Sequence, residues 1–333
     1  MTIGNKIGFV NAACAVIVIA FGSATRNAAA QIFRIGDAGT MSVEKLIEAV
    51  ALERAKERGV DYVRKSLKSD DITRQAFLSK EIDIVFGSNA YRLVQKLKIP
   101  AKHFFQLRML AYLPVVAKAS YKSWSDLNGQ EFVVHARGSG TEVLAHQMET
   151  AYKIKFKNVG FVPGSQVRAT ALLRGTIKAT YLNIPAVQYL MQKAPGKFKI
   201  LPAGDVSASD SALYARTEFL EKNAAKVQIL IEELLTVIRK TNADPNFIVA
   251  ERKRFNLMSR LTKDREEGIV PFYKVAAESQ LYPNNGGGAG RVKGDFMFYT
   301  MSGDLKGDPN NLKVEDYWDL RPLNAALDKL GRK

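Results

Sequence analysis

Apolar residues in the first part of this chain fall into short continuous runs that alternate with stretches of helical spacing. The run over residues 32–35 is typical of a buried strand, and residues 43–58 have the spacing of an amphipathic helix that Ser42 would cap. Two further strands and two further helices are expected over residues 60–64, 82–86, 71–80 and 91–97. The pattern predicts three successive pairs of strand and helix.

The same order returns further along the chain. Strands are expected over residues 132–134, 159–162 and 178–182, and helices over 141–152, 167–173 and 186–192. Alternation of this kind favours right-handed crossovers and parallel sheets, whose carboxyl-end loops bind ligands in open α/β folds. The sequence therefore predicts an α/β fold of two similar lobes, each a mostly parallel sheet flanked by helices.

Two extended apolar segments, residues 110–117 and 212–215, look like strands that carry the chain between the lobes. After them the spacing is helical, from Thr217 through Lys240 and in three later segments, and this tail is expected to pack back on the first lobe. We assign residues 31–115 with 215–333 to lobe 1 and 118–212 to lobe 2. Two hinge crossovers are then expected, near 115–118 and 211–214.

The first thirty residues have the three parts of a secretory signal. Lys6 precedes an uncharged apolar run over residues 12–21, and three alanines end the segment at Ala30. The run is shorter than the roughly 18 to 20 residues that a membrane anchor needs. Cys14 lies inside the run rather than after it, unlike the cysteine of a lipoprotein signal. We predict a signal peptide over residues 1–30, cleaved after Ala30, and a periplasmic protein.

Composition excludes several kinds of chemistry. Of the 333 residues, 47% are hydrophobic, which is ample for a core, and Cys14 is the single cysteine, so disulfides, cysteine zinc sites and CxxC redox motifs are excluded. His135 and His146 are too far apart for a metal pair on one helical turn, His103 stands alone, and no HExxH, Walker or GxSxG motif occurs. We expect no metal, no cofactor and no catalytic residues.

The charge balance is basic, with 49 Lys and Arg against 33 Asp and Glu and a formal net charge of +16. Such a charge fits an anionic ligand, a membrane surface or nucleic acid. The basic residues are interspersed with acids, as in residues 53–58, and no aromatic-interleaved basic motif occurs. We therefore expect no nucleic-acid partner.

Candidate ligand contacts lie in the loops between strands and helices. Residues Arg137, Gly138, Ser139, Gly140 and Thr141 join a strand to a helix, where free backbone N–H groups and the positive helix end favour an anion. The alternative is an ordinary turn with Thr141 as the N-cap. The matching loops of both lobes add the candidates Thr40, Ser42, Ser69, Ser88, Asn89 and Asn183, each of which is equally compatible with a plain turn.

Arg168 is a further candidate. Its guanidinium fork suits a carboxylate or sulfonate, although the residue could equally lie on the solvated face of its helix. Tyr181, near the third loop of the second lobe, is a candidate to stack on an aromatic part of a ligand. With the basic charge balance, these residues favour a small anion such as a sulfonate, a carboxylate or another oxyanion.

Three phrases carry a resemblance to a known family: DLNGQEF over residues 126–132, RGSGTE over 137–142 and VEDYWDL over 314–320. With the signal peptide, the two lobes and the helical tail, they resemble the type II periplasmic solute-binding proteins. Within these, the chain is most similar to the taurine, alkanesulfonate, nitrate and thiamine-precursor branch that serves ABC importers. The resemblance implies a monomeric, non-enzymatic receptor that closes on a small-molecule solute and delivers it to a membrane permease and its ATPase.

Two alternatives remain. The phrase RGSGTE is also similar to receptors of TRAP transporters for small carboxylates, although those open with a denser glycine cluster than residues 36–39 provide. The same scaffold also resembles some enzymes, such as a lyase of menaquinone synthesis. The signal peptide and the lack of an acid–base constellation argue against an enzyme.

Overall fold

The computed structural model of the chain describes residues 1–2, 4, 31–87, 89–203 and 208–332. The predicted signal peptide, apart from residues 1, 2 and 4, and the candidate Ser88 lie outside the described residues. The chain divides into two compact units, Met1–Gln31 and Ile32–Lys333. All that follows concerns the second unit.

The first sheet has five strands in the order β2-β1-β3-β10-β4. Strands β1, β2 and β3 run parallel, whereas β10 pairs antiparallel with both β3 and β4. The bounds are β1 Phe33–Ala38, β2 Tyr62–Leu67, β3 Ile84–Gly87, β4 Ala101–Met109 and β10 Ser209–Arg216.

The second sheet repeats this arrangement in the order β7-β6-β8-β5-β9. Strand β6 runs parallel to β7 and β8, and β5 pairs antiparallel with β8 and β9. The bounds are β5 Tyr112–Ala117, β6 Glu131–Val134, β7 Asn158–Phe161, β8 Ala179–Asn183 and β9 Phe198–Ile200. The predicted pair of matching, mostly parallel sheets flanked by helices is confirmed. We call the elements around the two sheets the first-sheet side and the second-sheet side.

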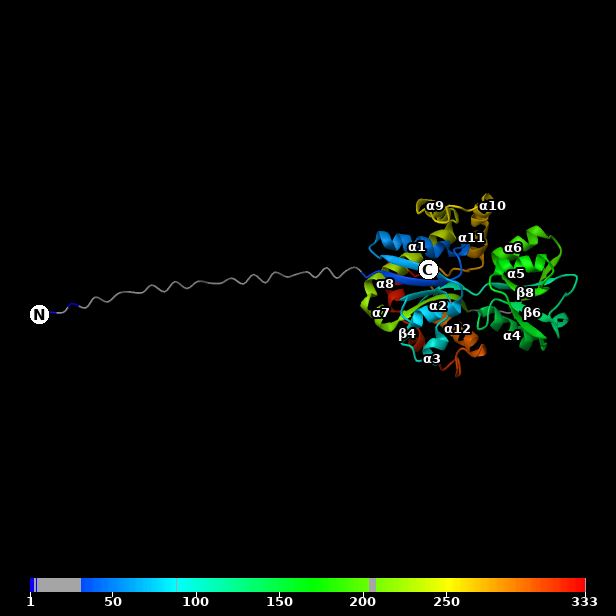
Figure 1. Cartoon of the computed structure of the whole chain (residues 1–333), viewed down its shortest axis with the longest axis horizontal. Helices are drawn as coiled ribbons and strands as arrows, with labels where there is room; N and C mark the ends of the chain where they lie inside the picture. The colour runs from blue at the N-terminus through cyan, green and yellow to red at the C-terminus, as the bar shows by residue number, and fades with distance from the viewer. Residues whose placement is uncertain (3, 5–30, 88, 204–207, 333) are drawn as a thin grey trace. The chain divides into compact units, whose positions relative to one another are not determined.

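Helices follow the parallel strands on both sides (Figure 1). On the first-sheet side these are η1 Val43–Lys45, α1 Leu46–Glu57, α2 Asp70–Leu78 and α3 Tyr91–Gln95, and on the second-sheet side η2 Ser125–Leu127, α4 Gly140–Tyr152, α5 Ser165–Leu173 and α6 Ile184–Lys193. The tail forms α7 Thr217–Lys222, α8 Ala224–Ala243, α9 Asn246–Arg254, α10 Lys263–Glu267, α11 Ile269–Glu278, α12 Ala289–Met301, α13 Val314–Tyr317 and α14 Arg321–Leu330.

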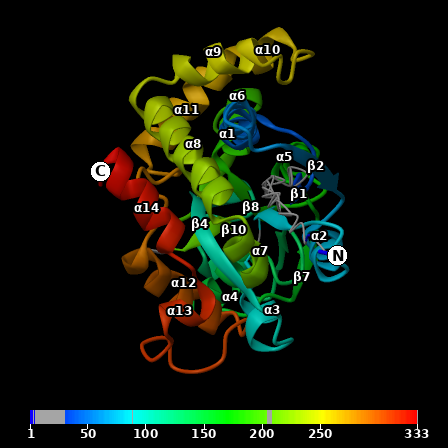
Figure 2. The ribbon, with the colours of Figure 1, turned by 90° about the vertical axis from the view of Figure 1, so that its left-hand side faces the viewer.

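The tail lies mainly on the first-sheet side. Helix α8 packs against α1, α11 and α14, and α14 also contacts β4 (Figure 2). The predicted helix from Thr217 through Lys240 is wrong as one element, because the chain breaks at Asn223, whose side-chain N–H donates to the carbonyl oxygen of Phe219 at 2.9 Å. Helix α12 contacts α4 of the second-sheet side, and it also bonds to the first-sheet side, where its Asp295 accepts hydrogen bonds from Ser209 and Tyr91.

The chain passes between the sheets at two short segments. Strand β4 ends at Met109 and β5 begins at Tyr112, so Leu110 and Ala111 make the first crossing. The second crossing lies between the end of β9 at Ile200 and the start of β10 at Ser209. The predicted crossings near 115–118 and 211–214 are wrong in position, because β5 and β10 are each paired within a single sheet.

Candidate functional site

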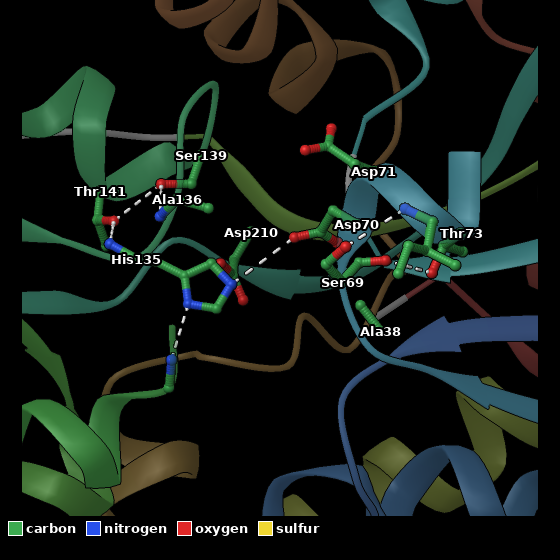
Figure 3. Close-up of polar contacts among 12 residues, drawn as sticks. Ala38, Ser69, Asp70, Asp71, Thr73, His135, Ala136, Ser139, Thr141 and Asp210 are labelled. Atoms are coloured by element: carbon green, nitrogen blue, oxygen red, sulfur yellow. Dashed lines mark hydrogen bonds and ion pairs between the residues drawn. The ribbon is translucent and has the colours of Figure 1, made fainter. Parts of the chain in front are cut away.

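The glycine-rich loop over residues 137–141 lies between β6 and α4, as predicted. Ser139, rather than Thr141, is the N-cap of α4. The Thr141 hydroxyl oxygen instead accepts a hydrogen bond from the backbone N–H of His135 at 2.9 Å, and the Ser139 hydroxyl oxygen accepts one from Ala136 at 3.3 Å (Figure 3). The two hydroxyl oxygens lie 3.0 Å apart. Both hydroxyls therefore shape the loop.

A side chain would be unfavourable at both glycines of this loop, for a different reason at each. Gly138 has φ +72°, in the left-handed region, and its N–H donates to Glu142 at 2.5 Å. Gly140 is in close contact with the first crossing, because a Cβ there would lie 2.7 Å from Cδ1 of Leu110. Arg137 is exposed, with its guanidinium carbon 5.2 Å from the centre of the Phe161 ring.

The predicted candidates on the first-sheet side have different local surroundings. Ser69 caps α2, with its hydroxyl oxygen accepting from the N–H of Ile72 at 3.3 Å, and this cap places Asp70 at the first turn of the helix. Ser42 precedes η1 without a side-chain cap bond, and Thr40 is exposed. Asn89 accepts a hydrogen bond from the N–H of Tyr91 at 3.2 Å, which makes it a local turn residue.

Among the described residues, polar contacts join the two sides at two points. Nδ2 of Asn183 donates to Oε1 of Glu44 at 2.6 Å. Nε2 of His135 faces Oδ2 of Asp70 at 3.8 Å (Figure 3). Asn183 is a predicted candidate and Asp70 lies in the predicted loop of the candidate Ser69, whereas Glu44 and His135 were not proposed as ligand contacts from the sequence.

Charged groups surround these contacts. Nε and Nη2 of Arg108 on β4 lie 2.8 and 2.7 Å from Oδ2 of Asp210 on β10. Burial raises the pKa of Glu44, and nearby Arg108 only partly opposes this shift. Burial likewise lowers the pKa of His135, which favours its neutral form. The cavity lined by Glu44, Arg108, Asn183 and Asp210 measures about 10 Å³, about the volume that one water molecule needs, so these four side chains leave almost no space among themselves.

Arg168 does not lie on the solvated face of its helix. Its side chain is fully buried, and its guanidinium donates to the carbonyl oxygen of Val162 at 2.8 Å and twice to that of Tyr181, at 3.0 and 3.1 Å. It also reaches the hydroxyl of Ser165 at 3.2 Å. Arg168 thus links the ends of β7 and β8, and burial lowers its pKa to about 10. The prediction of a solvated position is wrong.

Tyr181 is a core residue rather than a stacking surface. It is 1% exposed and packs edge-on against Phe132, with ring centres 5.4 Å apart. The expectation that it contacts an aromatic ligand is therefore wrong in this arrangement.

A second, larger cavity of about 660 Å³ lies between α4 and the end of α12, and its lining includes Glu142, His146, Met301 and Asp304. Within the described residues, no group of three or more His, Cys, Asp or Glu side chains is placed to hold a metal ion. No helix in the same part of the chain is long and apolar enough to cross a membrane.

The sequence matches no protein-family model and no curated protein. Solved structures do match its fold. A protein of Bordetella bronchiseptica RB50 aligns with 90% of this chain and 98% of its own, at 19% identity and a TM-score of 0.67.

Two others have informative names. The putative sulfonate ABC transporter, periplasmic sulfonate-binding protein SsuA of Methylobacillus flagellatus KT aligns with 90% of this chain and 94% of its own, at 17% identity and a TM-score of 0.58. The periplasmic nitrate-binding protein NrtA of Synechocystis PCC 6803 aligns with 90% and 89%, at 13% identity and a TM-score of 0.61. The chain therefore has the fold of periplasmic binding proteins, and the resemblance drawn from its sequence is confirmed at the level of fold.

Proposed function

We propose that the chain is an extracytoplasmic receptor that captures a small solute between its two sides and delivers it to the permease and ATPase of an ABC importer. The observation that carries the proposal is the meeting of loops from two matching sheets, with contacts from Glu44 to Asn183 and from Asp70 to His135. Among the described residues, the chain passes from the first sheet to the second at Leu110–Ala111, a two-residue connection about which hinge closure can bring these loops together. The similar structures named for sulfonate and nitrate binding support this role.

We propose a small anion, such as a sulfonate, a carboxylate or another oxyanion, as the solute. The support is the start of α4, a 13-residue helix whose first-turn N–H groups and positive end favour negative charge. The basic composition agrees with an anionic solute. A TRAP-type receptor for small carboxylates would use the same loop and is the second candidate.

A non-enzymatic role is part of the proposal. The two similar structures are named as a sulfonate-binding protein of a putative ABC transporter and as a periplasmic nitrate-binding protein, and these names support a receptor over a lyase. Nδ1 of His135 accepts a hydrogen bond from the backbone N–H of Gly164. This contact gives the histidine a structural role in its loop, which agrees with a protein that is not an enzyme.

We further propose export, with cleavage after Ala30, and a monomeric mature protein without nucleic-acid partners. Mass spectrometry of a periplasmic extract from cells that express the full chain tests the export. A mature N-terminus at Gln31 is expected. Recovery of only the intact chain from the cytoplasm contradicts export.

A thermal-shift screen against sulfonates, carboxylates, nitrate, neutral sugars and amines tests the receptor function, followed by small-angle scattering with each compound that binds. We expect an acid to raise the melting temperature. In small-angle scattering, we expect the protein with that acid bound to have a radius of gyration no larger than that of the free protein. If only neutral or cationic compounds bind, the solute is not an anion. If no compound in the screen binds, the receptor proposal itself fails.

A further inference from the structure

One edge of the second sheet carries a large excess of positive charge. The four segments 117–131, 149–158, 172–179 and 192–200 contain ten lysines and arginines against three acids. All ten cations are exposed, and we call them the basic edge: Lys118, Lys122, Lys153, Lys155, Lys157, Arg174, Lys178, Lys193, Lys197 and Lys199.

The ten side chains come from one end of the sheet. Strands β6, β7 and β8 run parallel and begin there, and the end of antiparallel β5 pairs with the start of β9 at the same edge. The loops also bond to one another directly. The N–H of Lys118 donates to the carbonyl oxygen of Lys197 at 3.0 Å, and Nζ of Lys199 donates to that of Lys122 at 2.8 Å. The cations therefore share one continuous surface.

Helix ends explain only part of this charge. Helices α4, α5 and α6 end at this edge, and Lys153, Arg174 and Lys193 lie at their C-caps or last residues, where a cation opposes the negative end of the helix. The other seven cations lie on strand ends and loops, so the helix ends do not account for them.

The three acids of this edge are already bonded within the fold. Asp126 accepts from two backbone N–H groups at 2.7 and 3.0 Å, and Glu131 accepts from Nδ2 of Asn158 at 3.0 Å. Glu149 accepts from a backbone N–H at 2.7 Å and pairs with Lys155 at 3.3 Å. Among the described residues, Lys155 is the one member of the basic edge in an ion pair.

Cations on the first-sheet side have different surroundings. Arg54 and Arg58 on α1 both bind Glu233, at 2.7 and 2.8 Å, and Arg64 on β2 binds Glu48 at 2.7 Å. Their charge is neutralised locally. Exposed cations that gather with few acidic partners instead produce a positive field that an extended anionic partner can use.

We propose that the basic edge binds the surface of a membrane that contains anionic lipids. The negative potential of such a surface attracts each nearby lysine, which contributes roughly 5-fold to binding. Two exposed side chains beside these lysines add to the fit: Tyr152 next to Lys153 and Ile200 next to Lys199, at 40% and 41% exposure. Tyrosine is favoured at the headgroup level of a membrane, and an apolar side chain gains by entering it. These two groups favour a membrane over nucleic acid.

The basic edge and the candidate ligand loops lie at opposite ends of the same strands. Strands β6 and β8 end at Val134 and Asn183, beside the loops that carry the solute candidates. A membrane bound at the basic edge therefore leaves those loops free. The inference goes beyond the proposed receptor function and does not depend on the identity of the solute.

Vesicle co-sedimentation of the mature chain, residues 31–333, tests the inference. The vesicles contain phosphatidylcholine alone or phosphatidylcholine with about one third phosphatidylglycerol. In low salt we expect the anionic vesicles to be bound about 10-fold or more tightly than the neutral ones. Raising the ionic strength to about 0.5 M is expected to reduce this binding about 10-fold or more, because salt screens exposed charges.

A triple variant identifies the surface responsible. Lys118→Gln, Lys178→Gln and Lys197→Gln together remove three exposed charges from the middle of the basic edge. Binding to the anionic vesicles is expected to weaken about 10-fold or more, as the contribution of each lysine predicts. The melting temperature and the thermal-shift response to solutes are expected to stay as in the wild type.

The matched control removes the same charge elsewhere. Lys56→Gln, Lys274→Gln and Lys313→Gln change exposed lysines on α1, on α11 and directly before α13. This variant is expected to bind anionic vesicles within about 2-fold of the wild type, because its lysines lie outside the basic edge. Equal losses in the two triple variants would show a response to net charge alone and overturn the inference, as would equal binding of the wild type to both kinds of vesicle.

Two competitors distinguish other sources of negative charge. Inorganic phosphate is expected to release no more protein from the vesicles than sodium chloride of equal ionic strength, and selective release by phosphate would indicate a site for a single anion and overturn the membrane assignment. Double-stranded DNA is expected to bind the mature chain more weakly than the anionic vesicles. Tighter binding to DNA that is lost in the basic-edge variant would make nucleic acid the partner and overturn the proposal.

Discussion

Asp295 on α12 accepts hydrogen bonds from both the backbone N–H and the hydroxyl of Ser209, at 2.6 and 3.0 Å. Ser209 is the first residue of β10, directly after the second crossing between the sheets. Tyr91 also donates to this carboxylate, at 3.0 Å, and Tyr299 donates to the carbonyl oxygen of Ser209 at 2.9 Å. The crossing thus ends in a buried polar network that fixes its first-sheet end.

This network predicts a pH dependence of stability. Burial raises the pKa of Asp295 to about 6, against 3.8 for the ordinary group. The folded state therefore binds the proton more tightly than the unfolded state does. Protonated Asp295 contributes roughly 2–3 kcal/mol to the free energy of unfolding; this contribution is complete below about pH 4 and is lost as the pH rises through 6. Urea unfolding of the wild type and of Asp295→Asn at several pH values measures it. A difference between the two proteins that stays constant from pH 4 to pH 7.5 contradicts the assignment.

Arg168→Lys is expected to lower the free energy of unfolding by about 1–3 kcal/mol. A lysine ammonium cannot reproduce the planar fork that serves Val162 and Tyr181 together, and a buried carbonyl left without a donor costs that amount. Arg174→Lys, at the exposed end of the same helix, is the control and is expected to change stability by less than about 0.5 kcal/mol. If Arg168→Lys and Arg174→Lys lower the free energy of unfolding equally in urea, the buried guanidinium of Arg168 does not contribute to stability as proposed.

Ser139→Asp is expected to weaken binding of whichever acid the screen identifies by about 1–3 kcal/mol. The substitution keeps a good N-cap residue on α4 and places negative charge at the helix end that would hold the anion. Ser139→Asn, which is similar in size and uncharged, separates charge from shape. Unchanged affinity of the Asp variant in titration calorimetry removes this loop from the binding site.

The sequence predicted the parallel strands well, because β1, β3, β6 and β8 are short apolar runs that end in turn residues. It did not predict β4 as a strand. In Ala101–Met109 the polar residues His103 and Gln106 are buried, where they bond to the Ala90 N–H and to Ser209, so the hydrophobic alternation of a strand is absent. The hydrogen-bond partners that allow such polar residues to be buried come from other parts of the chain, so a local sequence pattern does not reveal them.

The candidate site was predicted in part for the same reason. The loop over 137–141 and Asn183 follow strands directly, and their position between strand and helix is visible in the sequence. Glu44 is one of several acids in a helical pattern, and nothing local distinguishes it from a solvated residue. It becomes a site residue only because a cap more than one hundred residues away directs an amide toward it.

Gly140 and Leu110 are expected to be energetically coupled, because a side chain at Gly140 would contact Leu110 at the first crossing. A Cβ at Gly140 would lie 2.7 Å from Cδ1 of Leu110, which forces the leucine to move. Gly140→Ala in the wild type is therefore expected to destabilise the protein by about 1 kcal/mol, as moderate overpacking does. In a Leu110→Ala background the same change meets no such contact, and alanine's preference for helix makes it neutral or slightly stabilising.

A double-mutant cycle by urea unfolding measures this coupling, with an expected interaction energy of about 1 kcal/mol or more. Because Leu110 belongs to one of the two segments that join the sheets, Gly140→Ala is also expected to increase the radius of gyration in small-angle scattering, and Leu110→Ala to reverse the increase. Gly138→Ala is an informative comparison, since its cost arises from backbone conformation at φ +72° and should be the same in both backgrounds. Additive effects of Gly140→Ala and Leu110→Ala would show that the loop and the crossing move independently, and the glycine would then have no part in closure.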